Sequence, residues 1–393
     1  MAKLTLKDID LKNKVVLCRA DFNVPQDAGL KITDDTRIRA TLPTIRYILE
    51  NGAKKLVLVS HLGRPDGKVV EKYSLKPVAL RLSELLGEPV KFVNECVGES
   101  VKKEIDLSKE RVVLLENLRF HAEEEANDAN FAKQLASLAD IFVNDAFGTA
   151  HRAHASTEGV THYLKSAAGF LLGKEIQYLG SALQNPLRPF VVILGGAKVS
   201  DKIGVIDNLL PKADAIIIGG GMAYTFLKAQ GKNIGNSKLE KDKLDLAKSI
   251  LEKSEQLKKE IILPVDNVVV DNIAQDAKIE IVADNIPDGK IAVDIGPKTI
   301  ALFEAELKSA KTIVWNGPLG IFEMDPFSKG TKEVAMFIAG LECTSIIGGG
   351  DTAAAVTKFE VEDKMSHVST GGGASLEYLE GKNLPGVAAL TEK

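Results

Sequence analysis

The chain has 393 residues, of which 45% are hydrophobic and 26% are charged, and its formal net charge is −4. This length exceeds one ordinary hydrophobic core, so we expect a globular protein of two domains. The negative charge and an aromatic content of 5% argue against a general nucleic-acid-binding protein.

The cysteines and the N-terminus predict a cytoplasmic protein. Cys18, Cys96 and Cys343 lie far apart and form no C-x-x-C pair, which argues against disulfides and structural zinc. The N-terminus has no apolar signal core, and no apolar run is long enough to span a bilayer. We therefore expect no membrane association.

The first half of the chain repeats one arrangement, in which an apolar strand is followed by cationic or polar side chains. Strands are predicted at 15–18, 56–59, 112–115 and 141–143, and a helix opens at Asp35. The side chains that follow these strands or open this helix are Arg19, Asp21, Asn23, Arg37, His61, Arg64, Arg119 and Arg152. Carboxyl ends of parallel strands share one edge, so these residues are expected to converge.

Converging arginines with few carboxylates among them would repel each other unless an anion lies between them. Guanidinium groups match phosphate and carboxylate oxygens, so we expect a small polyanion there. Each arginine taken alone is also compatible with a solvated side chain or a surface ion pair. Arg19 and Asp21 are also compatible with an internal pair that holds the loop.

Two histidines three residues apart, His151 and His154, do not predict a metal site. No third ligand of suitable spacing follows them, and His162 is too distant to complete a pattern.

A helical segment at 169–183, broken before Pro186 and Pro189, predicts the domain boundary. The expected division is an N-terminal domain at 1–168, a connecting helix or hinge at 169–188 and a C-terminal domain at 189–378. Each domain is expected to be a doubly wound parallel sheet of α/β class, with helices on both faces.

In the second half, glycines replace arginines at the strand ends. The predicted strands are 191–194, 215–218, 261–263, 291–295, 312–314, 345–347 and 367–370, with a hairpin at about 268–281 and an amphipathic helix at 238–260. Bare backbone N–H groups and helix N-termini suit a phosphate chain. Lys198 and Lys202, which follow the first of these strands, add positive charge. Trp315 is interpreted as a packing residue.

Asp351 lies in a glycine-rich helix start, where it would repel phosphate unless a cation intervenes. Mg²⁺ between Asp351 and phosphate oxygens is one interpretation, and helix capping by Asp351 or Thr352 is the other.

The chain contains no G-x-x-x-x-G-K-[ST] motif. A relaxed dinucleotide fingerprint matches once, at 348–353, so an NAD(P)-dependent dehydrogenase is an alternative. It is disfavoured because Asp351 would face the pyrophosphate and because the next strand ends without a ribose-binding acid. A non-catalytic nucleotide- or polyanion-binding protein is a further alternative.

Two anion-binding edges of different chemistry favour a kinase that brings a phosphorylated acid to a nucleotide. A carboxylate acceptor is already ionised and needs no general base, which agrees with a sequence that shows no evident paired base. Catalysis would then consist of positioning and charge neutralisation.

Ten motifs resemble the phosphoglycerate kinase family, of the bacterial type. They are RADFNVP (19–25), DDTRIRA (34–40), SHLGRP (60–65), NLRF (117–120), GTAHRAH (148–154), GGAKVSDKI (195–203), GGGMAYTF (219–226), VWNGPLGIFE (314–323), GGGDT (348–352) and STGGGASLE (369–377). The motifs are in order and cover nearly the whole chain. Ala20 stands where the family usually has valine, which is a packing difference.

The resemblance implies reversible phosphoryl transfer between 1,3-bisphosphoglycerate plus ADP and 3-phosphoglycerate plus ATP, in glycolysis and gluconeogenesis. It implies a substrate site at Asp21, Asn23, Arg37, His61, Leu62, Gly63, Arg64, Arg119 and Arg152. It implies a nucleotide site at Lys198, Lys202, Gly220, Gly296, Asn316, Glu323, Gly349, Gly350, Asp351 and Thr352, with Mg²⁺ at Asp351. The catalytic residues implied are Arg37, Lys198 and Gly372.

The resemblance also implies a monomeric cytoplasmic enzyme that uses MgATP and closes by hinge bending. Closure would exclude water that would otherwise hydrolyse the acyl phosphate. A C-terminal tail at about 379–393 is expected to return to the first domain.

Overall fold

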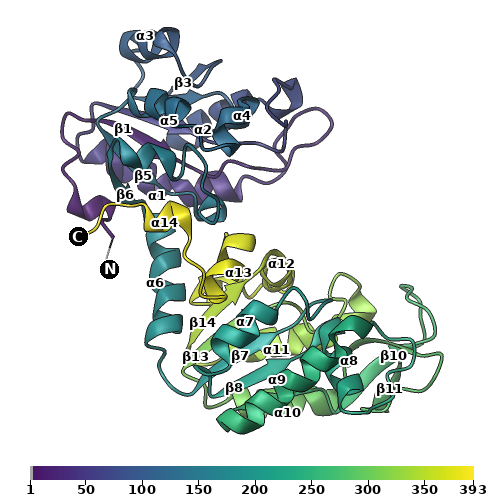
Figure 1. Ribbon diagram of the computed structural model, residues 1–393. Helices are drawn as coiled ribbons and strands as arrows, with labels where there is room; N and C mark the ends of the chain where they lie inside the picture. The colour runs from purple at the N-terminus through teal and green to yellow at the C-terminus, as the bar shows by residue number, and fades with distance from the viewer. Residues whose placement is uncertain (1–2) are drawn as a thin grey trace. The chain divides into compact units, whose positions relative to one another are not determined.

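The computed structural model describes residues 3–393, and the chain divides into two compact units (Figure 1). The first unit comprises the chain up to Gln177 together with Asn383–Lys393, and the second unit comprises Tyr178–Lys382. The division falls inside helix α6 (Phe170–Gln184).

The first unit contains a six-stranded, fully parallel sheet in the order β3-β4-β2-β1-β5-β6. Its strands are β1 (Val15–Arg19), β2 (Lys55–Val59), β3 (Val90–Val93), β4 (Val112–Leu115), β5 (Ile141–Asn144) and β6 (Lys165–Ala168). Four of them were predicted. Strands β3 and β6 were not predicted, because β3 is only partly buried and β6 is short and rich in alanine.

Helices cover both faces of this sheet. They are α1 (Thr36–Glu50), α2 (Lys76–Leu86), α3 (Glu99–Leu107), α4 (Ala122–Glu125) and α5 (Ala129–Ala136), with short 3₁₀ turns η1 (Leu6–Asp8), η2 (Glu71–Tyr73), η3 (Leu118–Phe120), η4 (Phe147–Thr149) and η5 (Gly159–His162). Successive side chains of β1 pack on opposite faces of the sheet. Val16 and Cys18 pack in one core cluster with Ile45 of α1, whereas Leu17 packs in the opposite cluster with Leu135 of α5.

The C-terminal segment of the chain is hydrogen-bonded into the first unit. Thr391 accepts from the backbone N–H of Leu4 at 2.8 Å. Gly386, in helix α14 (Pro385–Ala388), donates to the Ala150 carbonyl at 2.9 Å and accepts from Asn144 Nδ2 at 3.1 Å. The end of the chain therefore contributes to the stability of the unit in which the chain begins.

The second unit contains another parallel six-stranded sheet, in the order β15-β14-β13-β7-β8-β9. Its strands are β7 (Phe190–Leu194), β8 (Ala215–Ile218), β9 (Glu260–Ile262), β13 (Thr312–Asn316), β14 (Thr344–Gly348) and β15 (His367–Val368). Two parallel sheets with flanking helices confirm the predicted fold class. Trp315 in β13 is fully buried in the core, as interpreted.

The helices of the second unit are α7 (Ile203–Leu209), α8 (Gly220–Ala229), α9 (Leu244–Leu257), α10 (Pro297–Leu307), α11 (Lys329–Ala339), α12 (Gly350–Lys358) and α13 (Gly373–Leu379), with turns η6 (Lys241–Lys243), η7 (Asp325–Phe327) and η8 (Glu362–Lys364). The helix predicted from residue 238 therefore begins at Leu244. Among the helices described in residues 3–393, none combines the length and apolar character needed to cross a membrane.

A separate three-stranded sheet corrects one prediction. The expected hairpin is present, as β10 (Asp266–Val270) and β11 (Glu280–Ala283), but β12 (Ile291–Ile295) pairs antiparallel with β10 and lies outside the parallel sheet. A strand of five residues with four apolar side chains suits either kind of sheet, so composition alone did not distinguish them.

Asp145 connects the end of β5 to the start of α6. Its carboxylate accepts from the N–H groups of Leu171 and Leu172 at 2.8 and 3.2 Å. The side chain is fully buried, and its second oxygen has no hydrogen-bond partner among the described residues. Burial raises the pKa of Asp145 to about 7, against the Thr44 side chain and the helix N–H groups, which favour the anion.

Asp145→Asn should change the pH dependence of stability. A carboxyl group with a raised folded pKa contributes stability below pH 3.8 that is lost as the pH rises through about 7. Asparagine keeps an acceptor for the helix N–H groups and has no charge to bury. Between pH 5 and pH 8, the unfolding free energy of the variant should therefore rise relative to wild type by about 1–3 kcal/mol. Urea unfolding followed by circular dichroism measures this, and an unchanged difference would contradict it.

Candidate active site

In the first unit, His61 lies at the centre of the strand-end cations. It follows β2 and is only 4% exposed. Burial, followed by the charges of the surrounding arginines, lowers the pKa of His61 well below its ordinary value; these arginines are Arg19, Arg119, Arg37 and Arg152. Four of the predicted arginines therefore converge on one neutral histidine.

Arg19 orients the His61 ring through a hydrogen bond. The guanidinium is fully buried, and its Nε donates to Ser156 Oγ at 2.9 Å while Nη2 lies 3.2 Å from His61 Nδ1. Arginine can only donate, so Nδ1 must accept and the ring proton must be on Nε2. His61 can therefore donate a hydrogen bond to an anionic oxygen without being charged.

The loops after β1 and β2 are joined by side chains of the predicted site. Asp21 accepts from Arg37 Nη1 through both oxygens at 3.1 Å, so its ion pair is with Arg37 and not with Arg19. Asn23 Oδ1 accepts from the N–H of Gly63 at 2.8 Å, and the Gly63 carbonyl accepts from Arg119 Nη1 at 3.0 Å.

Gly63 must be a glycine for two reasons. Its φ of +63° lies in the left-handed region, and a Cβ at this position would collide with the ring of Tyr73. Asn117 holds Leu62, the residue before Gly63. Its Nδ2 donates to the carbonyls of Leu62 and Tyr73 at 2.7 and 2.9 Å. The predicted Leu62 therefore contributes its backbone to this framework.

The remaining arginines differ in exposure. Arg64 is exposed, whereas Arg152 is half-buried and its Nε lies 3.2 Å from His151 Nε2. Arg119 is only 4% exposed, and its buried Nη2 has no hydrogen-bond partner among residues 3–393. A buried guanidinium nitrogen without an acceptor is a place where a ligand oxygen would fit.

Glu124, which was not predicted, places a negative charge near the buried cations. Glu124 is fully buried and accepts from Ser156 through its Oγ at 2.6 Å and its N–H at 2.9 Å. Burial raises the pKa of Glu124, while the charge of Arg19 lowers it. Glu124 belongs to an acidic run, which in a sequence looks like a solvated helix start.

In the second unit, two neighbouring cavities lie at the carboxyl edge of the parallel sheet. The glycine-rich cavity, of about 340 Å³, is lined by residues that include Lys198, Asp201, Lys202, Asn316, Gly349, Gly350, Asp351, Thr352 and Gly372. The apolar cavity, of about 370 Å³, is lined by residues that include Gly220, Tyr224, Lys238, Ile291, Val293, Leu319 and Glu323. Gly196, Ala197 and Asp351 line both cavities.

Lys202 and Asn316 form the polar centre of the glycine-rich cavity. The Lys202 ammonium donates to Asn316 Oδ1, and the buried Nδ2 of Asn316 has no partner among the described residues. Burial lowers the pKa of Lys202, against the charges of Asp201 and Asp351, which raise it. Lys198 is exposed at the wall of the same cavity. This cavity presents cations and an unused donor, as an anion site requires.

The strand-end loops of this unit lie against one another through glycines. A Cβ on Gly195 would meet the backbone of Gly317 and Pro318, so no side chain fits between these loops. Thr352 Oγ1 accepts from the N–H of Gly317 at 2.6 Å and fixes the loop after β13 to α12. Because these loops carry no side chains at their contact, their backbone can line the glycine-rich cavity directly.

The structure argues against one of the two interpretations of Asp351, helix capping. Helix α12 has Gly349 at its N-cap and no side-chain cap hydrogen bond, so neither Asp351 nor Thr352 caps it. Asp351 is exposed in the first helical turn, at the wall of both cavities.

Of the predicted nucleotide residues, Gly296 is not brought to either cavity. It follows β12, the strand of the small sheet, and a Cβ there would collide with the Asp266 carboxylate. Asp266 accepts from Lys298 and Thr299 N–H groups at 3.0 and 2.8 Å and so occupies the N-terminus of α10. Three residues that line the apolar cavity, Tyr224, Lys238 and Leu319, were not predicted. Tyr224 and Leu319 look like core residues in the sequence, and Lys238 looks like a solvated residue of the predicted amphipathic helix.

Arginines lie at the strand ends of one α/β unit, and glycines and lysines lie at those of the other. Two anion-binding sites of this kind are what an α/β phosphotransferase with two phosphorylated ligands requires. A model of the family "Phosphoglycerate kinase" matches residues 6–382. Proteins of that name from Koribacter versatilis and Moorella thermoacetica are each 59% identical, over 404 and 395 residues, with 100% of each chain covered.

Two solved structures are similar to the whole chain. Phosphoglycerate kinase from Coxiella burnetii has a TM-score of 0.92 at 45% identity, and that from Pyrococcus horikoshii OT3 has a TM-score of 0.83 at 35% identity. Each comparison covers 98% of both chains. The chain therefore belongs to the phosphoglycerate kinase family.

His61 should remain neutral throughout the physiological pH range, with its proton on Nε2. Nitrogen NMR of the labelled imidazole should show no titration between pH 5 and pH 8 and a protonated Nε2. In Arg19→Met the pKa should rise, because a neighbouring cation and the donor to Nδ1 are both lost. Arg39→Met, at an exposed pair with Asp35, is the control and should leave His61 unchanged. Titration of wild-type His61 near 6.5 would contradict the assignment.

Proposed function

We propose that the chain catalyses reversible phosphoryl transfer between 1,3-bisphosphoglycerate and ADP through two distinct anion sites. The first unit binds the phosphoglycerate and the second binds the nucleotide. Membership of the phosphoglycerate kinase family supports the reaction. This assignment of one ligand to each unit is supported by one contrast: the first unit has arginine side chains at its strand ends, and the second has bare backbone N–H groups.

In the first unit, the proposed ligands of 3-phosphoglycerate are the polar side chains around His61. Arg64, Arg119 and Arg152 supply charge-assisted hydrogen bonds to phosphate, and the unused Nη2 of Arg119 supports this assignment. Asp21 and Asn23 accept from the ligand's hydroxyl group or hold the loops in place. Arg37, fixed by Asp21, neutralises the group that is transferred.

In the second unit, the proposed nucleotide site spans both cavities. The glycine-rich cavity takes the phosphates, with Lys198, Lys202 and Gly372 around them. The apolar cavity takes the adenosine, with Gly220 near it and Glu323 as the ribose acceptor. Gly296 does not enter this proposal, because Asp266 occupies the helix start that follows it.

Mg²⁺ fits the glycine-rich cavity, whose wall contains the exposed Asp351 carboxylate. Asp351 would hold the ion together with nucleotide phosphates and water, which supply the oxygen ligands that Mg²⁺ prefers. When bound, the ion would neutralise phosphate charge.

The chemistry that these residues support requires no general base. The acceptor is a carboxylate, which is ionised at neutral pH, and the described cations are arginines and lysines. Lys198 and Arg37 would stabilise the charge spread over the transferred group, and the amides near Gly372 would do the same. The enzyme contributes orientation and charge, while His61 donates a hydrogen bond and remains neutral.

Lys198→Ala should reduce turnover far more than affinity. Removing one donor to a charge that develops in the transition state typically costs about 10²–10³ in kcat. Steady-state kinetics with both substrates measures this, and Lys248→Ala, an exposed lysine of α9, is the control. Near-normal turnover in Lys198→Ala would remove the residue from the catalytic set.

Arg64→Ala should weaken 3-phosphoglycerate binding about 10–100-fold, because a charge-assisted hydrogen bond is lost, and should leave ADP binding almost unchanged. Calorimetry with each ligand separately makes the comparison. Arg111→Ala is the control, since Arg111 precedes β4 at the opposite edge of the sheet and pairs with Glu88. Equal losses for both ligands would contradict the assignment of the two units.

A coupled assay of ADP release with and without 3-phosphoglycerate distinguishes the kinase from a binding protein. A dehydrogenase is disfavoured by the family assignment. We also propose that the enzyme is cytoplasmic, which its three free cysteines support, and that it is a monomer, which the family resemblance implies. Sedimentation at working concentration tests the oligomeric state.

A further inference from the structure

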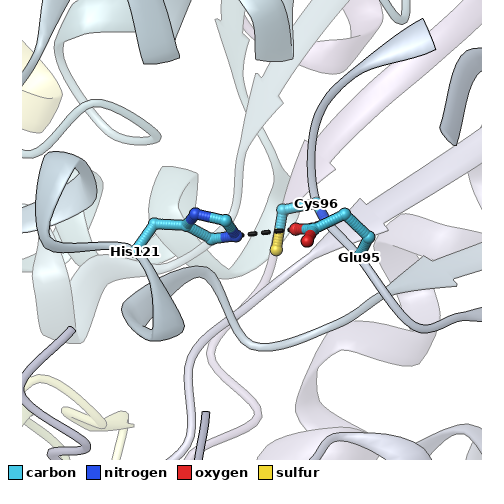
Figure 2. Close-up of side chains that lie close together, drawn as sticks. All are labelled: Glu95, Cys96 and His121. Carbon is cyan, nitrogen blue, oxygen red and sulfur yellow. Dashed lines mark hydrogen bonds and ion pairs between the residues drawn. The ribbon is translucent and has the colours of Figure 1, made fainter. Parts of the chain in front are cut away.

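Three potential metal ligands meet in the first unit at the ends of two adjacent strands. Strands β3 and β4 are paired in parallel, with Val93 opposite Leu115. Glu95 and Cys96 follow β3, and His121 follows the turn η3 after β4. Figure 2 shows the carboxylate, the sulfur and the imidazole directed toward a common space.

The distances within this cluster suit a single ion. The ligand atoms of Glu95, Cys96 and His121 all lie within 4.8 Å of one another. His121 Nε2 and Glu95 Oε1 are 2.6 Å apart. Tetrahedral zinc separates neighbouring ligand atoms by roughly 3.3–3.7 Å, given its bond lengths. Shifts on the order of 1 Å would therefore form the site.

The three side chains are already held in place. Cys96 is 1% exposed, and its Sγ lies 2.8 Å from the Glu116 carbonyl, to which it donates. Glu95 Oε1 also accepts from the Cys96 N–H at 2.7 Å. The His121 ring packs against Phe131, with 5.2 Å between ring centroids. Binding would therefore order few additional rotamers.

We propose that Glu95, Cys96 and His121 form a binding site for a thiophilic divalent cation of the zinc type, with a fourth position open to water. Sulfur and imidazole ligands select such ions over Mg²⁺, which prefers oxygen alone. A thiolate and a carboxylate balance the two positive charges, and the neutral imidazole adds none. The site is thus chemically distinct from the proposed magnesium site at Asp351.

Binding releases a proton from the thiol. The S–H bond of Cys96 breaks, the proton goes to solvent and the S–metal bond replaces the hydrogen bond to Glu116. If His121 binds through Nε2, its ring proton resides on Nδ1. Because binding releases this proton, the affinity for the metal should increase with pH.

The ion would connect the loop after β3 to the segment that carries part of the proposed substrate site. Arg119 lies two residues before His121, and Asn117, which holds Leu62, lies in the same segment. The sequence showed no such site because residues 95, 96 and 121 match no zinc-ligand spacing. Only the pairing of β3 with β4 brings them together.

Cobalt titration of the full chain tests the proposal, because thiolate ligation gives a near-ultraviolet charge-transfer band. Chelator-treated wild type should bind one equivalent of Co²⁺ with this band, and Zn²⁺ should displace it. Cys96→Ser should abolish the band, and His121→Gln should weaken binding at least about tenfold. His162→Gln removes a histidine paired with Glu158 at 2.7 Å but without a neighbouring thiol, and it should change nothing. Cys343→Ser is the matched cysteine control.

Several results of this titration would overturn the proposed metal site. Wild type without the band, or an unchanged affinity for Co²⁺ in His121→Gln, overturns the proposal. Loss of the band in His162→Gln or Cys343→Ser overturns it as well, because the ion would then bind elsewhere. Circular dichroism checks folding of each variant, and His121→Gln keeps the buried cysteine in place if Cys96→Ser fails to fold. Kinetic activity plays no part in the readout, so failure here leaves the proposed function untouched.

Discussion

Parallel strand pairing is the constraint on which both units depend. Because β1, β2, β4 and β5 run in the same direction, their carboxyl ends meet at one edge, and every loop that leaves this edge begins beside the others. The same holds for β7, β8, β13 and β14 in the second unit. Strand pairing alone therefore makes neighbours of residues that are distant in sequence. The proposed metal cluster between β3 and β4 arises from the same geometry.

Converging cations at such an edge have an electrostatic cost, and the first unit limits it in two ways. Glu124 places a buried carboxylate near Arg19, and Asp21 pairs with Arg37. His61 loses its charge altogether, since burial and the arginines lower its pKa. Arg119 retains an unused donor. The arrangement is thus stable without an anion but still offers hydrogen bonds to one.

The sequence predicted the fold class and most of the strands, because strands buried on both faces are continuous apolar runs between turn residues. It did not predict which sheet a run joins, so β12 was assigned to the parallel sheet although it belongs to the small antiparallel sheet. It predicted the residue types at the strand ends but not their burial. Arg19 proved to be a fully buried orienting residue, and Glu124 gave no signal, since burial depends on packing that composition does not encode.

The two carboxyl groups whose pKa values are raised most clearly hold structural elements together and have no catalytic role. Burial raises the pKa of Asp145 to about 7 and that of Asp294 to about 7, values typical of general bases. Yet Asp145 holds the start of α6, and Asp294 accepts from the Gly330 N–H at 2.6 Å at the start of α11. Neither lines the two cavities of the second unit. A reaction whose acceptor is already an anion has no use for a base, so here a carboxyl group with a raised pKa serves to join elements. The chemistry instead requires groups whose charge stays fixed across the working pH range, namely arginine, lysine and a histidine held neutral.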